Sequence, residues 1–466
     1  MNPDIREETR ALRRLAVPIV LTNLGTMAMG LVDTLMVGRL NDPDSLAAVA
    51  LAGVWIHGTS LFAMGLVFGM DPIITQGFGA RDRRKMGLAL HRGFLVALLA
   101  SLGVMWCWSR TGAFLNSIEG LLPGGASLEG FSESTVALAD RYSQVQVWSA
   151  APFLLFIALR QHLQGRGIVR PALVAILACN VVNALANHAL IFGAYGFPAM
   201  GLEGAGIATG ITRAAMFGLL ALMVWQLDLL RGARTKVSRH SFSIGGVREL
   251  LGYGIPTAFQ MALEVWAFGA ATLMAGLLGQ AATSAHHIVL NLASTTFMVP
   301  MGISFAATTR VGNLLGARRP RRAQTAAWVS IALGAGTMSV SAVIFVTARH
   351  WVPSLYFGDT QAPGVAEVIT LCAAILPIAA AFQIFDGIQV VGCGVLRGMG
   401  QTMPAAVINL VGYWVLALPL AWWMTSTLGL GLFGIWWGIA IGLAIVAVAL
   451  LAFLRVRGPA RSPSAI

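Results

Sequence analysis

Charged side chains are scarce in this sequence. Asp, Glu, Lys and Arg make up 11% of its 466 residues, whereas they make up about 25% of an ordinary soluble domain. Hydrophobic residues make up 57%, and the mean hydropathy is +0.76. So little charge cannot cover a surface that faces water. The composition therefore excludes an ordinary soluble globule and is typical of a protein that crosses a membrane many times.

Motifs that supply chemistry or chemical energy are also missing. The sequence has no Walker A motif, no HExxH motif, and no segment with room for an ATPase domain. The four cysteines lie in or at the ends of apolar runs without a CxxC pattern, and we interpret them as small buried hydrophobic residues. They are Cys107, Cys179, Cys372 and Cys393. We therefore expect no enzyme and no cofactor, with an ion gradient as the energy source.

Long apolar runs dominate the sequence instead. A helix that spans a membrane needs about 20 mostly apolar residues, and twelve runs meet this requirement. They lie near residues 15–39, 46–72, 91–111, 136–160, 167–193, 201–228, 249–279, 284–309, 325–348, 364–396, 404–426 and 430–454. The sequence thus predicts an all-α polytopic membrane protein with twelve transmembrane helices.

The basic residues are confined to one set of segments. Of the 31 Lys and Arg residues, 26 lie in the N-terminal segment, the central loop, the C-terminal tail, or loops that would share one side of the membrane with them. The positive-inside rule then predicts that both termini lie in the cytoplasm, below a bacterial inner membrane. This topology explains the net charge of +12 without a nucleic-acid partner.

The two halves of the sequence resemble each other. Residues 18–40, PIVLTNLGTMAMGLVDTLMVGRL, align without a gap to residues 256–278, PTAFQMALEVWAFGAATLMAGLL, and three shorter matches follow in order. Because each half has an even number of spans, the repeats should be parallel and related by a pseudo-twofold axis along the membrane normal. Parallel repeats of this kind are typical of secondary transporters.

The repeat also predicts the domain organisation. We expect a cytoplasmic N-terminal segment (1–14), an N-terminal six-helix lobe (15–228), a cytoplasmic inter-lobe linker (229–248), a C-terminal six-helix lobe (249–455) and a disordered cytoplasmic tail (456–466).

Three acidic residues lie deep inside apolar spans, where acids are rare and usually functional. They are Asp33, Glu264 and Asp386. Glu264 and Asp386 fall in the same half and so can share one cavity. A carboxylate there can hold a proton, Na⁺ or a cationic ligand, and competition between these occupants would couple their transport. The alternative is that each is a protonated or backbone-bonded structural acid.

A polar pocket is also expected in the first half. Asn180, Asn183 and Asn187 line one face of the fifth span, and with Asp33 and Thr209 they can surround a ligand. The alternative is that these amide side chains form hydrogen bonds that hold neighbouring helices together.

Other polar residues in the spans are harder to interpret. Arg213 can pair with an acid or extend to the interface, and the sequence does not decide between these. His286 and His287 at the start of the eighth span are more often packing groups than proton relays. Asp71, next to Pro72 at the end of the second span, is interpreted as interfacial.

Several longer motifs resemble the multidrug and toxic compound extrusion (MATE) family, and most of all its NorM-type bacterial branch. In the second half these are PTAFQMALEVWAFGAATLMAGLLG, AHHIVLNLASTTFMVPMG, RVGNLLGA and QIFDGIQVVGCGVLRGMGQTMPAAVINLVGYWVLALPL. In the first half they are VDTLMVGRL, LAAVALA and QGFGA. The resemblance covers residues 12–455.

The resemblance implies a V-shaped pair of six-helix bundles that exports drugs in exchange for cations. It implies a cation site, for Na⁺ or a proton, at Glu264 and Asp386. It also implies a polar site for cations and substrate in the N-terminal lobe, formed by Asp33, Asn183, Asn187 and Thr209. Some relatives place a Tyr one turn before the second acid of the cation site, where this sequence has Phe382.

Three functions remain open at this point. The first is an Na⁺- or H⁺-driven multidrug antiporter, monomeric, with drug-like molecules and membrane lipids as its partners. The second is a flippase for lipid-linked saccharides, which would need several deep basic residues where this sequence has only Arg213. The third is an intramembrane enzyme, which would need a nucleophile–base pair or a metal cluster that the sequence lacks.

Overall fold

The computed structural model describes residues 3–40, 42–119, 133–357 and 364–461, and in these residues all regular structure is helical. The first half contains α1 (Pro3–Gly38), α2 (Pro43–Phe68), α3 (Met70–Gly79), α4 (Arg83–Trp108), α5 (Thr111–Glu119), α6 (Glu133–Gln144), η1 (Val147–Ser149), α7 (Ala150–Gly165), α8 (Arg170–Phe192), η2 (Ala194–Gly196) and α9 (Gly201–Gln226). The second half contains η3 (Arg239–Phe242), α10 (Ile244–Gly276), α11 (Gln280–Gly316), α12 (Pro320–Thr347), α13 (Trp351–Ser354), α14 (Val365–Gly398), α15 (Thr402–Asn409), η4 (Leu410–Ala417), α16 (Leu418–Ser426) and α17 (Leu432–Arg457).

The number of spans agrees with the sequence. Eleven helices in the described residues are long and apolar enough to cross a membrane, and α6 with α7 makes a twelfth if the two are counted together across a 41° bend. The predicted span at 136–160 is therefore a broken helix. Helix α10 begins at Ile244, inside the segment predicted as a linker, and α17 ends at Arg457. Of the predicted disordered tail, residues 462–466 lie outside the described residues.

Local signals in the sequence set several helix ends. Asp42 precedes α2 and accepts a hydrogen bond from the backbone of Asp44, while Pro43 occupies the first turn. Asp82 caps α4 by accepting from the backbone N–H of Lys85 at 2.8 Å. Gly193, with φ of 73°, ends α8 in the left-handed conformation that favours glycine.

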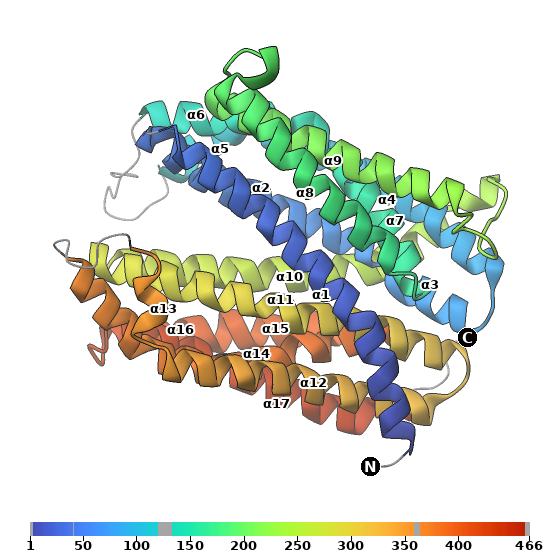
Figure 1. The fold of residues 1–466 in the computed structure, drawn as a ribbon. Coiled ribbons are helices and arrows are strands. Elements are labelled where there is room, and N and C mark those ends of the chain that lie inside the picture. The colour runs from blue at the N-terminus through green and yellow to red at the C-terminus, as the bar shows by residue number, and fades with distance from the viewer. Residues whose placement is uncertain (1–2, 41, 120–132, 358–363, 462–466) are drawn as a thin grey trace.

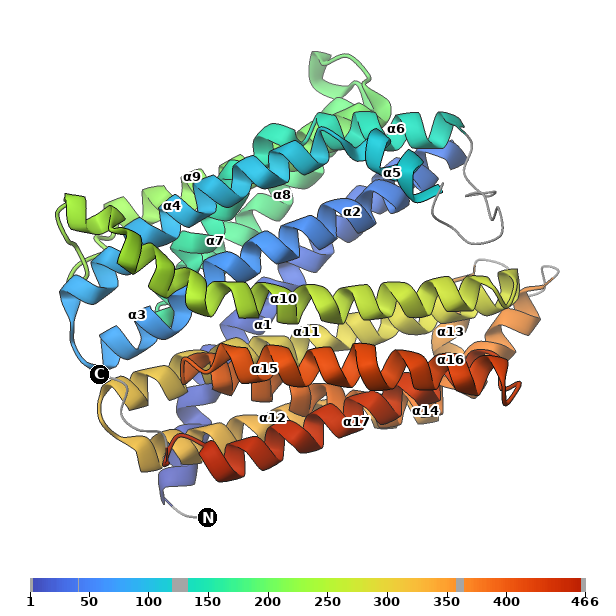
Figure 2. The same ribbon diagram turned by 180° about the vertical axis from the view of Figure 1, so that it is seen from behind.

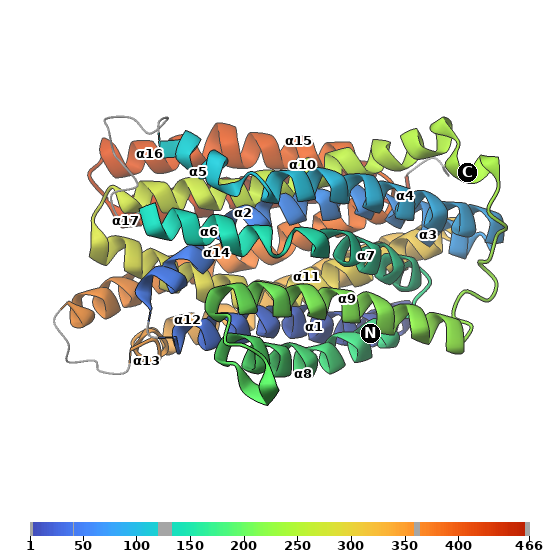
Figure 3. The ribbon, with the colours of Figure 1, turned by 90° about the horizontal axis from the view of Figure 1, so that it is seen from above.

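The helices form two groups that are inclined to each other (Figures 1 and 2), and Figure 3 shows them from above. We call α1–α9 the N-terminal lobe and α10–α17 the C-terminal lobe. Helix α1 runs obliquely between the two groups, in contact with α8 of its own lobe and with α11 and α12 of the C-terminal lobe. The other main contacts between the lobes are those of α2 with α10 and of α3 with α11.

The two lobes meet closely at one end only, which we call the basic end because the arginine-rich loops gather there. Glycine lets the backbones touch: a side chain at Gly65 would collide with the backbone of Ala258, and one at Gly69 with that of Gly254. Toward the opposite end α2 and α10 diverge, and on the same helix faces Val54 is 76% exposed and Leu273 is 67% exposed. The ribbons also separate in that direction (Figure 2). The described conformation is closed at the basic end and open at the other.

Candidate functional site

Glu264 and Asp386 face the interior of the C-terminal lobe from α10 and α14. Asp386 is buried, with 4% of its surface exposed, and Glu264 is half-buried. The amide of Gln389, one turn after Asp386, donates to Glu264 Oε2 at 3.2 Å and to Asn409 Oδ1 at 2.9 Å. Asn409 in turn donates to Cys393 Sγ at 3.3 Å. Glu264 therefore belongs to a polar network that joins α10, α14 and α15, and Asp386 lies near enough to Glu264 to interact with it electrostatically.

Several oxygen atoms near the two acids lack a hydrogen-bond partner among the described residues. In the described part of the chain, four buried oxygens near the two acids have no hydrogen-bond partner, although buried polar atoms are almost always bonded. They are Asp386 Oδ1, Gln389 Oε1, Gln383 Oε1 and the hydroxyl of Tyr413. Oxygens without donors suit a proton, a water molecule or a hard cation such as Na⁺.

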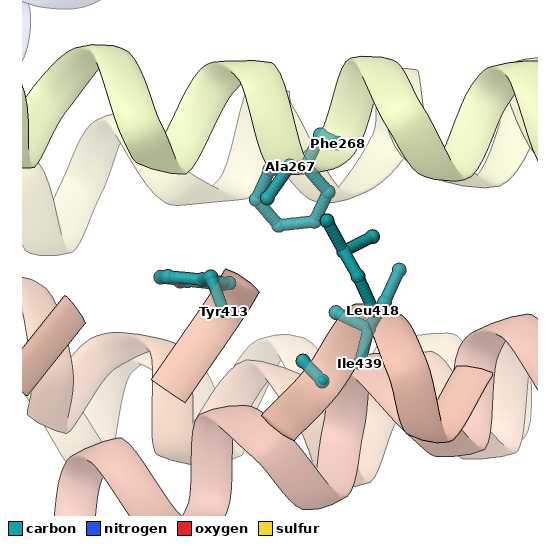
Figure 4. Close-up of a pocket in the computed structure, with 6 residues that line it drawn as sticks. Ala267, Phe268, Tyr413, Leu418 and Ile439 are labelled. Carbon is teal, nitrogen blue, oxygen red and sulfur yellow. The ribbon is translucent and has the colours of Figure 1, made fainter. Parts of the chain in front are cut away.

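Aromatic side chains cover this network. Phe382, one turn before Asp386, meets the ring of Phe268 edge-on at 5.9 Å between centroids and that of Trp436 at 6.1 Å. Tyr413 lies on the π-helical segment η4 and faces Phe268 across a narrow gap that is also lined by Leu418 and Ile439 (Figure 4). π-Helical turns are frequent at functional sites. The position of Phe382 thus has no hydroxyl, but Tyr413 places one nearby.

The predicted pocket of the N-terminal lobe is assembled as a hydrogen-bond network around Asp33 on α1. Its Oδ1 accepts from Asn187 at 2.5 Å and from Asn183 at 2.9 Å, both on α8. Its Oδ2 accepts from Thr209 on α9 at 2.9 Å. All four residues are buried. Because the donors come from two helices, Asp33 holds α1 against α8 and α9.

Three other polar residues that the sequence suggests as candidates lie outside both networks. Asn180 donates to the backbone carbonyls of Gly25 and Ile176 and so packs α8 on α1. His287 contacts the ring of His286, at 6.1 Å between centroids, and has no contact with either acid network among the described residues. Arg213 lies inside the N-terminal lobe without an acidic partner in the described chain.

A third polar cluster joins the lobes at the basic end. Asp71 on α3 is buried, with 3% exposed, and accepts two hydrogen bonds from Gln161 at 3.1 Å each. It also pairs with Arg397 on α14 at 3.8 Å. The interfacial position expected for Asp71 is therefore wrong, because the opposite lobe covers it. A lone acid beside a proline gives no sign of a partner more than 300 residues away.

Comparison with known proteins identifies the fold and the family. The sequence profile of the MatE family matches residues 18–188 and 256–423, one stretch in each half. The chain is a member of the MATE family. It is a multi-pass membrane transporter and not an enzyme. The two stretches that match agree with the internal repeat.

Named relatives of this MATE protein are similar over nearly the whole chain. A probable multidrug resistance protein NorM of Bradyrhizobium diazoefficiens is 36% identical over 96% of this chain and 93% of its own length. A probable multidrug resistance protein NorM of Pseudomonas putida is 34% identical over 95% and 93%. The multidrug resistance protein MdtK of Yersinia pestis is 31% identical over 98% and 97%.

Solved structures share the fold at lower identity. The eukaryotic MATE transporter AtDTX14 superposes with a TM-score of 0.88 at 22% identity and covers 98% of each chain. An outward-facing conformation of a multidrug resistance MATE family transporter has a TM-score of 0.82 at 20% identity and covers 97% of this chain and 96% of its own. The fold expected from the sequence is thereby confirmed.

Proposed function

We propose that this protein is a secondary active multidrug antiporter that exports amphipathic, mostly cationic molecules in exchange for Na⁺ or H⁺. The names of its relatives support a multidrug substrate range. The missing nucleotide-binding motif supports a coupling ion as the energy source. The Glu264–Asp386 site supports the proposal most strongly, because its unpartnered buried oxygens can accept a cation or a proton.

Coupling follows if the occupants of these networks exclude one another. In the C-terminal lobe, Glu264 and Asp386 would take up the coupling ion, and the pair favours Na⁺ over a proton without deciding between them. In the N-terminal lobe, Asp33 with Asn183, Asn187 and Thr209 would bind a cation or substrate. A ligand can change the balance between inward-open and outward-open states only if it binds them with different affinity. Release on one side and binding on the other then drives export.

The orientation of the protein in the membrane determines which state of the transport cycle the described conformation represents. With both termini in the cytoplasm of a bacterial cell, the closed basic end lies on the cytoplasmic side. The open end then faces outward, where drug leaves and the coupling ion enters. We propose that a monomer is sufficient, because both networks lie within one chain.

Dye efflux from reconstituted vesicles tests this function. Efflux of a fluorescent cationic dye is measured under an Na⁺ gradient and a pH gradient imposed separately. We expect one gradient to drive export, and Glu264→Gln, Asp386→Asn and Asp33→Asn each to reduce it to near background with normal membrane insertion. Glu367→Gln, an equal change at an exposed acid in the first turn of α14, should leave export unchanged.

Two outcomes contradict the proposal. Normal export by all three variants would remove the acids from the mechanism. Export by the wild type under neither gradient would favour the lipid-linked saccharide substrate.

A further inference from the structure

Arg213 is a basic residue inside the N-terminal lobe that no part of the antiport scheme uses. Its guanidinium lies over the rings of Trp108, at 5.3 Å, and Phe153, at 5.1 Å. One nitrogen donates to Ser149 Oγ at 2.9 Å. Among the described residues this is its one hydrogen bond, and no carboxylate lies within 4.0 Å. The side chain therefore neither pairs with an acid nor extends to the membrane surface.

The remaining donors of Arg213 are available. A guanidinium carries five N–H donors in a fixed plane, and the contact with Ser149 uses one nitrogen. The side chain is half-buried, and among the described residues no other group accepts a hydrogen bond from the remaining donors. Two aromatic rings fix the plane of the guanidinium. The arrangement leaves an oriented cation with unused hydrogen-bonding capacity.

Asp33 lies close to Arg213 but does not neutralise it directly. The two charges are near enough to interact electrostatically, yet the bonds to Asp33 come from Asn183, Asn187 and Thr209. Thr209, which donates to Asp33, and Arg213 are four residues apart on α9, so their backbone positions differ by about 6 Å of helical rise and lie on one face of the helix. An acid and a base thus lie within electrostatic reach of each other in the same lobe.

We propose that Arg213 is an anion-binding group for substrate, which takes the carboxylate of a transported zwitterion while Asp33 holds its cationic group. The assignment rests on the proposed function, because it names a substrate class for the same transporter. A guanidinium binds a carboxylate through two parallel hydrogen bonds. Asp33 has capacity left for a cation, because a carboxylate accepts about four hydrogen bonds and three are in place. The site therefore accepts a molecule with both charges.

A matched pair of dyes tests this assignment. A rhodamine with a free carboxylate is a zwitterion at neutral pH, and its methyl ester is a cation of nearly the same shape. Binding of each to purified protein in lipid nanodiscs is followed by fluorescence anisotropy. Arg213→Gln should weaken binding of the free acid at least about tenfold, as expected for a lost charge-assisted bond. Binding of the ester should change by less than about twofold.

Two further variants make the test specific. Arg213→Lys should restore part of the affinity for the free acid, because lysine keeps the charge but cannot form the paired hydrogen bonds. Arg141→Gln removes the same charge from an exposed side chain of the same lobe, which pairs with Glu203, and should affect neither dye. If Arg213→Gln does not fold, the smaller loss of affinity for the free acid in Arg213→Lys, with unchanged binding of the ester, tests the assignment instead.

Three results would overturn the inference. The first is that Arg213→Gln weakens the binding of both dyes equally. The second is that Arg213→Gln leaves binding of the free acid unchanged. The third is that the wild type binds the ester more strongly when acetate is added. The last would mean that the anion is a separate small carboxylate and not part of the substrate. Export of the ester by the wild type tests the proposed function separately, because that step does not require Arg213.

Discussion

Single oxygens distinguish the two acid networks. Both oxygens of Asp33 accept hydrogen bonds, whereas Asp386 Oδ1 and the hydroxyl of Tyr413 have no partner among the described residues. A buried polar atom without a partner costs about 1–3 kcal/mol. The network of the C-terminal lobe is therefore incomplete until an ion, a proton or water enters it. In the N-terminal lobe both carboxylate oxygens of Asp33 are bonded, and the buried atom of that network without a partner in the described chain is the amide oxygen of Asn187.

The hydroxyl of Tyr413 is a candidate ligand for the coupling ion. We expect Tyr413→Phe to raise the concentration of the driving ion needed for half-maximal thermal stabilisation of the purified protein by about fivefold, the effect of one lost hydrogen bond or ligand contact of roughly 1 kcal/mol. Adding Phe382→Tyr to this variant should restore part of the affinity, because it places a hydroxyl one turn before Asp386.

Tyr253→Phe is the matched control for this measurement. Tyr253 is half-buried at the basic end of α10, next to Gly400, and loses the same hydroxyl. It should leave ion-dependent stabilisation unchanged. A Tyr413→Phe protein with the ion dependence of the wild type would show that the hydroxyl makes no contact with the ion.

The acidic members of these networks could be predicted from the sequence, but their neutral partners could not. Asp33, Glu264 and Asp386 are conspicuous because a carboxylate is costly in an apolar run. Gln389, Asn409 and Tyr413 have no such signal, since uncharged polar residues in spans commonly serve packing.

Among the helices, α2 and α10 are decisive for the conformation. Gly65 of α2 and Gly69, directly after the end of α2, approach the backbones of Ala258 and Gly254 so closely that any side chain would collide. Toward the other end of α2 the contact with α10 is made by side chains, with Phe62 edge-on to Phe259 at 5.5 Å between centroids, and further along Val54 is 76% exposed. The closed end of the molecule thus depends on two glycines spaced four residues apart.

A side chain at Gly65 should force the closed end apart. We expect Gly65→Val to disfavour the outward-open state by about 1–3 kcal/mol, the usual cost of overpacking, and to reduce dye export about tenfold or more. Gly53→Val places the same side chain on the same helix where nothing lies within 4 Å and should export normally. Equal export by both variants, at equal expression, would show that the contact does not limit transport.

Hydropathy predicted the number of helices but not their breaks. Twelve apolar runs correspond to the observed spans because length and apolarity are set by the membrane. The bend between α6 and α7 and the π-helical segment η4 depend on packing against neighbouring helices. Such contacts leave no periodic pattern in the residues concerned.

In the whole molecule, two sets of ion pairs close the basic end. Asp71 of the N-terminal lobe pairs with Arg397 of the C-terminal lobe. Glu8 of α1 is fully buried and accepts from Arg310 of α11 at 2.6 and 2.9 Å and from Arg322 of α12 at 2.7 Å. Both sets must separate if the lobes are to open at this end, so their strength sets the balance between the two states.

Weakening the ion pair between Asp71 and Arg397 should open the basic end more often. Asp71→Asn keeps the shape and can still bond to Gln161, but it leaves Arg397 without its acid, and loss of one partner of a buried pair is costly. We expect a cysteine introduced at Thr75, which is buried beside Gly312, to react with a membrane-impermeant thiol reagent from the basic side several-fold faster in Asp71→Asn than in the parent. Labelling of the four native cysteines is measured in the protein without Thr75→Cys and is subtracted from the total.

The same measurement separates closure by charge from closure by backbone packing. Asp228→Asn breaks an exposed pair with Arg234 within the segment between the lobes and should leave the labelling rate unchanged. The double exchange Asp71→Arg with Arg397→Asp restores opposite charges across the lobes and should lower the rate toward that of the parent. If Asp71→Asn reacts no faster than the parent, the ion pair contributes nothing to closure. The contacts at Gly65 and Gly69, together with Glu8, would then hold the two lobes shut.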